Sequence, residues 1–80
     1  MKPSAMDPKV LNVRGLQCPL PVLRANKVLR GMAPGDEVTV LATDAAAPKD
    51  FESFCATTGH RLISCREDGG IFTIVLRKAG

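Results

Sequence analysis

The spacing of the apolar residues changes from one segment of this 80-residue chain to the next. The order in which strand-like and helix-like spacings follow one another restricts the fold more than any other feature of the sequence. Residues 9–13 and 37–42 have the β-branched or alternating pattern of strands, and residues 60–67 and 71–77 form two further β-rich runs. The segments after the first two strands instead repeat their apolar residues with the 3.6-residue period of a helix. The predicted order of elements is therefore βαβαββ.

Proline and glycine mark the ends of both predicted helices. The first begins around Pro19, because proline suits a first helical turn, and ends near Gly31. In the second helix, Pro48 fits the first turn and Gly59 fits the C-terminal cap. The predicted core stripes consist of Val22, Ala25, Leu29 and Met32 in the first helix, and of Ala47, Phe51, Phe54, Cys55 and Thr58 in the second.

The connections between these elements define the fold class. Helical crossovers favour parallel neighbouring strands, and Asp68-Gly69-Gly70 predicts an antiparallel hairpin. Since each helix has one apolar stripe, both are expected on one face of a mixed four-stranded sheet. We predict an α/β (α+β) two-layer sandwich, with one domain over residues 9–80. Residues 1–8 contain two prolines and no periodic pattern, which predicts a flexible N-terminal tail.

The composition argues against several classes of protein. No apolar run approaches the roughly 20 residues that cross a bilayer, and the N-terminus lacks the apolar centre of a secretory signal. A cytoplasmic protein without a membrane partner is therefore expected. Because the chain has no Trp, no Tyr and three Phe, it lacks the usual stacking platforms for bases, and direct nucleic-acid binding is not expected.

The net charge of +3 is unevenly distributed along the chain. Residues 1–30 carry six basic side chains and one acidic one, while the remaining residues carry more acids than bases. The basic residues nearest to Cys18 are Arg14, Arg24, Lys27 and Arg30. They are equally consistent with a solvated helix face and with a docking surface for an acidic partner. Leu20 and Leu23 fall off the core stripe, so they are candidates for an apolar docking rim around Cys18.

Three cysteines without a close pair leave at least one free thiol, and Cys18 has the most distinctive surroundings. It lies between the Gly15 turn and two prolines, Pro19 and Pro21, that stiffen the predicted helix start. Unpaired N–H groups and the helix macrodipole favour an anion there, so we expect the pKa of Cys18 to lie below that of an unstructured peptide. Cys55 and Cys65 are expected in the core.

Most cysteine chemistries need partners that this sequence does not provide. His60 is the only histidine, and its place between the second helix and the third strand predicts a structural role, which disfavours a cysteine protease. The absence of a C-x-x-C pair argues against zinc binding, so neither a metal nor a cofactor is expected. One activated thiol can still accept a sulfane sulfur as a persulfide and pass it to another protein.

The segment Cys18-Pro19-Leu20-Pro21, preceded by Gly15-Leu16, carries a resemblance to a known family. Together with "PGDEVTVLATD", "KDFESFCATTGHRL" and "EDGGIFTIVLRK", it makes residues 10–78 similar to the TusA/SirA-like family of small sulfur-carrier proteins, whose signature is C-P-x-P. The resemblance implies the same βαβαββ sandwich, similar to the C-terminal domain of a translation initiation factor. It also implies that Cys18 carries persulfide sulfur.

The resemblance further implies protein partners on both sides of the transfer. The donor is a cysteine desulfurase or a rhodanese, and the acceptor belongs to tRNA thiolation, molybdenum-cofactor biosynthesis or sulfur oxidation, a choice that the sequence leaves open. One departure is Asn12, a position commonly occupied by aspartate in the family, although asparagine can still accept a turn hydrogen bond.

We therefore expect a monomeric sulfurtransferase that acts as a covalent persulfide carrier. Cys18 is its predicted catalytic residue, supported by Gly15, Leu16, Pro19 and Pro21. The alternative is an RNA-binding or regulatory protein-interaction module, whose activity would be indifferent to Cys18→Ser.

Overall fold

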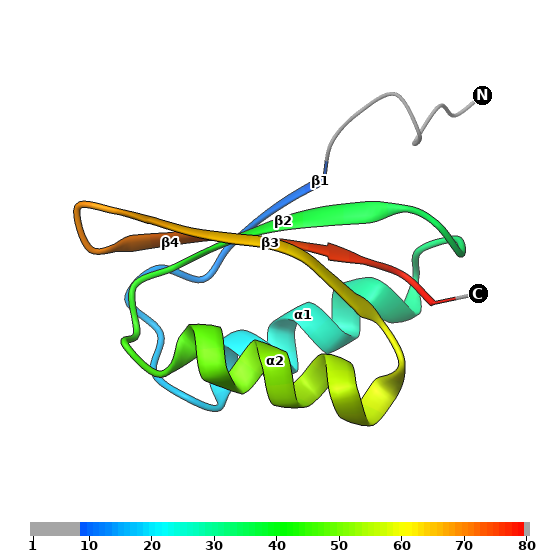
Figure 1. Cartoon of the computed structure of the whole chain (residues 1–80), viewed down its shortest axis with the longest axis horizontal. Coiled ribbons are helices and arrows are strands. Elements are labelled where there is room, and N and C mark those ends of the chain that lie inside the picture. The colour runs from blue at the N-terminus through cyan, green and yellow to red at the C-terminus, as the bar shows by residue number, and fades with distance from the viewer. Residues whose placement is uncertain (1–8, 80) are drawn as a thin grey trace.

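The structure is a computed structural model that describes residues 9–79. It consists of a four-stranded sheet with both helices on one face (Figure 1). The elements are β1 (Lys9–Asn12), α1 (Leu20–Arg30), β2 (Glu37–Ala42), α2 (Ala47–Thr58), β3 (Arg61–Asp68) and β4 (Ile71–Arg77). The predicted βαβαββ order and the two-layer arrangement are confirmed. The N-terminal tail expected at residues 1–8 lies outside the described residues. Within residues 9–79, no helix has the length and apolar character of a membrane span.

The strands are ordered β1-β2-β4-β3 across the sheet. β1 and β2 are parallel, as the helical crossover predicts, whereas β4 is antiparallel to both β2 and β3. β2 and β3 therefore run in the same direction but are not neighbours, because the last strand lies between them. This central place suits β4, which is the apolar run "IFTIVLR" with Ile74 and Leu76 fully buried.

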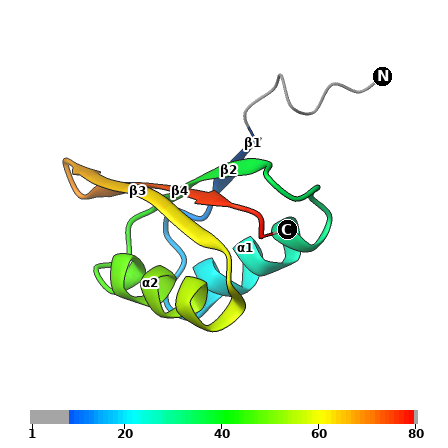
Figure 2. The same cartoon turned by 45° about the vertical axis from the view of Figure 1, so that its right-hand side comes forward.

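The hydrophobic core consists of residues from the sheet, from both helices and from the loops between them. Figure 2 shows the two layers from a second side, with both helices on the same face of the sheet. The buried members of the core are Val13, Ala25, Leu29, Met32, Val38, Val40, Ala42, Ala47, Phe51, Cys55, Ile74 and Leu76. On α2 the predicted stripe is largely confirmed, although Phe54 is only partly buried and Thr58 is exposed. Gly59 caps α2 in the left-handed conformation (φ 88°), and its N–H donates to the carbonyl of Cys55, as its position predicts.

Cys55 is buried in this core, but the prediction that Cys65 is also a core residue is wrong. Cys65 pairs with the fully buried Ile74 of β4, yet it is exposed. The reason is its place on β3, an edge strand with no further strand beside it. Alternation along a strand identifies the side of the sheet that a residue faces, but not its distance from the edge.

His60 joins α2 to β3 and has the structural surroundings that its position predicts. The N–H of Ala79 donates to its Nδ1 at 2.9 Å, and its ring centroid lies 5.7 Å from that of Phe54. Burial and the nearby positive charge of Lys78 lower the pKa of His60. The neutral imidazole therefore holds the backbone of Ala79 close to the start of β3.

Candidate functional site

A glycine turn directs the chain from β1 to Cys18. Gly15 has φ 83°, a conformation that residues with a Cβ rarely adopt. Its N–H donates to Oγ1 of Thr43 at 2.9 Å, and the N–H of Leu16 donates to the carbonyl of Val13 at 3.2 Å. Leu16 packs partly buried against the core. The turn is thereby fixed to the sheet on one side and to the segment after β2 on the other.

Asn12 completes this turn in the way expected of an asparagine. Its Oδ1 accepts hydrogen bonds from the backbone N–H of Arg14 at 3.1 Å and from the Nε of Arg14 at 3.0 Å. The turn acceptor that an aspartate would supply is therefore present in this chain. The Arg14 side chain is held beside Asn12 by the second of these bonds.

Cys18 lies just outside the first helix. Helix α1 begins at Leu20 with Pro19 as its N-cap, so Pro19 lies before the first turn and Pro21 within it. The carbonyl of Pro19 accepts the N–H of Leu23 at 3.0 Å, and Pro21 is buried. Pro21 therefore lies in the first turn, Pro19 lies one residue before the helix and not within its first turn, and the Cys18 thiol is exposed in front of it.

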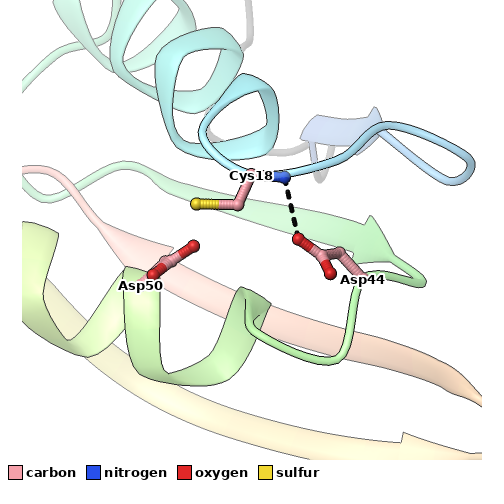
Figure 3. A group of neighbouring side chains, drawn as sticks. All are labelled: Cys18, Asp44 and Asp50. Carbon is pink, nitrogen blue, oxygen red and sulfur yellow. Dashed lines mark hydrogen bonds between the residues drawn. The ribbon is translucent and has the colours of Figure 1, made fainter.

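Asp44, a residue that the sequence analysis did not single out, holds the backbone of Cys18 in place. Its Oδ2 accepts the N–H of Cys18 at 2.8 Å (Figure 3). Its Oδ1 accepts the N–H of Ala46 at 3.4 Å, and its carbonyl accepts the N–H of Ala47 at 2.9 Å. An aspartate shortly before a helix is a common capping signal, but that signal does not indicate a bond to Cys18.

Asp50, also missed from the sequence, is the side chain toward which the Cys18 thiol points (Figure 3). The sulfur and one carboxylate oxygen each of Asp44 and Asp50 lie within 4.8 Å of one another. Hydrogen bonding to Asp50 raises the pKa of Cys18, and burial and the negative charges of both aspartates add to that effect.

The expected lowering of the Cys18 pKa is therefore wrong. The favourable effect of a helix N-terminus on an anion is modest and confined to the first turn, and Cys18 lies before that turn. Two carboxylates close to the sulfur act in the opposite direction. None of the basic residues of the N-terminal part contributes to the pKa of the thiol within the described range.

The three side chains also raise the question of a metal, since each offers one ligand atom. Both carboxylate oxygens of Asp44 already accept backbone N–H groups, however. One thiol and two carboxylates also differ from the Cys and His sets of structural zinc sites. Positioning of Cys18 accounts for the cluster without an ion.

Cys18 lies at a groove between α1 and α2 that has a volume of about 340 Å³. The groove is lined by Cys18, Pro19, Val22, Asp50, Ser53, Phe54, Thr57 and Thr58. Outside the groove, Leu20 and Leu23 are 44% and 55% exposed, as their position off the core stripe predicts. The thiol therefore lies where a partner can reach it, beside apolar side chains that can contact that partner.

Comparisons with known proteins identify the family. The model of the family described as "Sulfurtransferase TusA" matches residues 9–78. The chain belongs to the TusA family. A Neisseria meningitidis protein whose name contains the words "sulfur carrier protein" is 54% identical over 90% of this chain and 97% of its own length. The sulfur carrier protein TusA of Allochromatium vinosum is 44% identical over 86% of this chain and 91% of its own.

A solved structure supports the fold of this TusA-family chain. The SirA-like protein from Desulfitobacterium hafniense has a TM-score of 0.77 and 23% sequence identity, and the match covers 89% of this chain and 97% of that one. The family membership makes sulfur transfer the function of the chain, with donor and acceptor proteins as its partners.

Proposed function

We propose that Cys18 is the residue that carries the sulfur, as a persulfide on its Sγ. The observation behind this proposal is the exposed Cys18 thiol at the groove between the helices, within the intact C-P-x-P segment of a TusA-family chain. The other two cysteines are less suited to the role. Cys55 is buried, and Cys65 lies within the ladder of an edge strand.

Each transfer is then an exchange between a thiol and a persulfide. In loading, Cys18 Sγ attacks the outer sulfur of the donor persulfide, the S–S bond of the donor breaks, and a new S–S bond forms on Cys18. The donor leaves as a thiol and takes up the proton that Cys18 loses. In delivery, an acceptor thiol attacks the outer sulfur, and Cys18 is restored. No external oxidant or reductant is consumed.

The residues around Cys18 have distinct supporting roles in this proposal. Gly15 and Leu16 fix the turn that presents the thiol, and Pro19 and Pro21 fix the start of α1 behind it. None of the four supplies a group that reacts. Together they keep the sulfur outside the helix, where a donor persulfide can approach it.

The partner surface in this proposal is the exposed side of α1 next to the thiol. Leu20 and Leu23 supply apolar contact, while Arg14, Arg24 and Lys27 are exposed and complement an acidic partner. A cysteine desulfurase or a rhodanese is the donor, and the acceptor is a protein thiol of a biosynthetic or sulfur-oxidising route.

The test is intact-protein mass spectrometry after incubation with a cysteine desulfurase, pyridoxal phosphate and cysteine, and in parallel with rhodanese and thiosulfate. We expect a gain of one sulfur atom that dithiothreitol reverses, in the wild type and in Cys65→Ser but not in Cys18→Ser. A gain that persists in Cys18→Ser, or no gain with either donor, would contradict the proposal.

A further inference from the structure

The surroundings of Cys18 are unusual for a nucleophile. The thiolate is the reactive form of cysteine, and positive groups normally favour it. Here the charged groups that act on the thiol are the carboxylates of Asp44 and Asp50, and both disfavour the thiolate. The free protein therefore holds its proposed sulfur-carrying residue in the less reactive form.

The position of Asp50 relative to the thiol is built into the fold. Asp50 lies in the first turn of α2, and its side chain is partly buried at the edge of the groove. Asp44 accepts the N–H of Cys18 with one oxygen and bonds to Ala46 and Ala47 at the start of α2. One residue thus connects the Cys18 backbone to the helix that carries Asp50, which keeps the carboxylate facing the sulfur.

We propose that Asp50 is a restraining residue: its carboxylate, within 4.8 Å of the Cys18 sulfur, keeps the thiol protonated in the free carrier, and a sulfur donor releases the thiol by placing a lysine or arginine side chain beside the carboxylate. This inference rests on the proposed function of Cys18. On release, the thiol proton passes to the donor thiolate that leaves as the S–S bond is exchanged, so protons and electrons balance without a further reactant.

Such a restraint has a chemical purpose in a protein whose nucleophile is exposed. Oxidation to sulfenic acid and reaction with small electrophiles both follow thiolate character and exposure. Cys18 is exposed, so the protonation state is the remaining means of protecting it between transfers. A partner that pairs with Asp50 removes the protection only where the transfer takes place.

The first experiment measures the restraint in the free protein, without any sulfur donor. The rate of Cys18 alkylation by iodoacetamide, a neutral probe, is followed from pH 6 to pH 10 (roughly the range around an ordinary thiol pKa) by mass mapping of the Cys18 peptide. We expect Asp50→Asn to react several-fold faster than the wild type at neutral pH, with its pH profile moved to lower pH.

The matched control is Glu52→Gln, which removes one negative charge from the same helix at a site that acts on Cys65. It should leave Cys18 alkylation unchanged, and circular dichroism should show that both variants are folded. An Asp50→Asn rate equal to or below that of the wild type would overturn the restraint. Because no sulfur is transferred, this result does not depend on whether Cys18 is the carrier.

The second experiment tests release by a partner. Sulfur loading from a cysteine desulfurase and cysteine is timed for the wild type and for Asp50→Asn. If the donor relieves the restraint, Asp50→Asn should raise the rate of sulfur loading by a smaller factor than the rate of Cys18 alkylation. The loading rate can also fall below that of the wild type, because the variant lacks the carboxylate that the donor's cation contacts. A gain in loading as large as the gain in alkylation would show that the donor does not act on Asp50.

Discussion

Cys18 and Cys65 are both exposed thiols with a raised pKa, yet their surroundings differ. Hydrogen bonding to Asp50 is the main cause at Cys18, whereas burial is the main cause at Cys65 and the charge of Glu52 adds to it. Cys18 faces a groove between two helices, and Cys65 lies on the edge strand β3. Exposure alone therefore does not distinguish the two thiols, and the neighbouring side chains do.

The two backbones are also held in different ways. Cys65 belongs to the β3–β4 ladder, in which main-chain hydrogen bonds between the two strands hold the backbone in place. The Cys18 N–H is held by one side chain, that of Asp44. A single substitution can therefore remove the bond that holds the backbone of Cys18, whereas no single side chain of the described residues holds the backbone of Cys65.

The largest expected effect on stability comes from Asp44→Ala. It removes the acceptor of the Cys18 and Ala46 N–H groups, and bonds to a charged acceptor at a partly exposed site contribute about 1–2 kcal/mol. Glu67→Ala on β3 is the matched carboxylate and should change the free energy of unfolding by less than about 0.5 kcal/mol. Urea denaturation measures both. Equal losses would remove the contrast between loop and strand.

A smaller effect is expected on partner recognition, from Leu23→Gln. Leu23 is 55% exposed on α1, the helix that follows Cys18, and losing the burial of that surface against a donor is worth about 1 kcal/mol, or roughly fivefold in the rate of sulfur loading at low carrier concentration.

Ile63→Gln is the counterpart on β3, since Ile63 is 42% exposed. It should leave loading unchanged, and neither variant should alter unfolding by much. A slower rate in Ile63→Gln and an unchanged rate in Leu23→Gln would place the docking surface on β3 instead of α1.

The smallest expected effect is a pH dependence of the free energy of unfolding caused by His60, which precedes β3. The pKa of His60 is lowered from 6.5 by burial and by Lys78, so the unfolded chain binds this proton at a higher pH than the folded one. The free energy of unfolding should therefore decrease slightly as pH falls through about 6.5, because protonation favours the unfolded state there. His60→Asn should lack this slope in urea denaturation between pH 5.5 and 7.5 (roughly one unit either side of an ordinary histidine pKa). A slope unchanged in His60→Asn would assign it to other groups.

The parts of the fold that were predictable from the sequence depend on local patterns. Gly31 and Gly59 lie at the helix ends, and Val38, Val40 and Ala42 are buried on β2, because turn chemistry and alternation act over a few residues. The position of Cys18 outside the core was predictable for the same reason.

The electrostatics of the site could not be read from the sequence in this way. Asp44 and Asp50 are separated from Cys18 by the whole of α1 and β2, and only the parallel pairing of β1 with β2 brings the two loops together. The helix start next to Cys18 in sequence suggested the wrong direction for the shift of its pKa. Proximity along the chain was a poor guide to proximity in space.

The sheet also separates the ends of the described chain from the thiol. β1 begins and β4 ends beside residues 37–38, at the start of β2, whereas the Asp44 that holds Cys18 follows the opposite end of β2 (Figure 1). A second domain joined at either end of this fold would therefore attach near the start of β2, away from the Cys18 thiol. The architecture is therefore compatible with use as one module of a longer polypeptide.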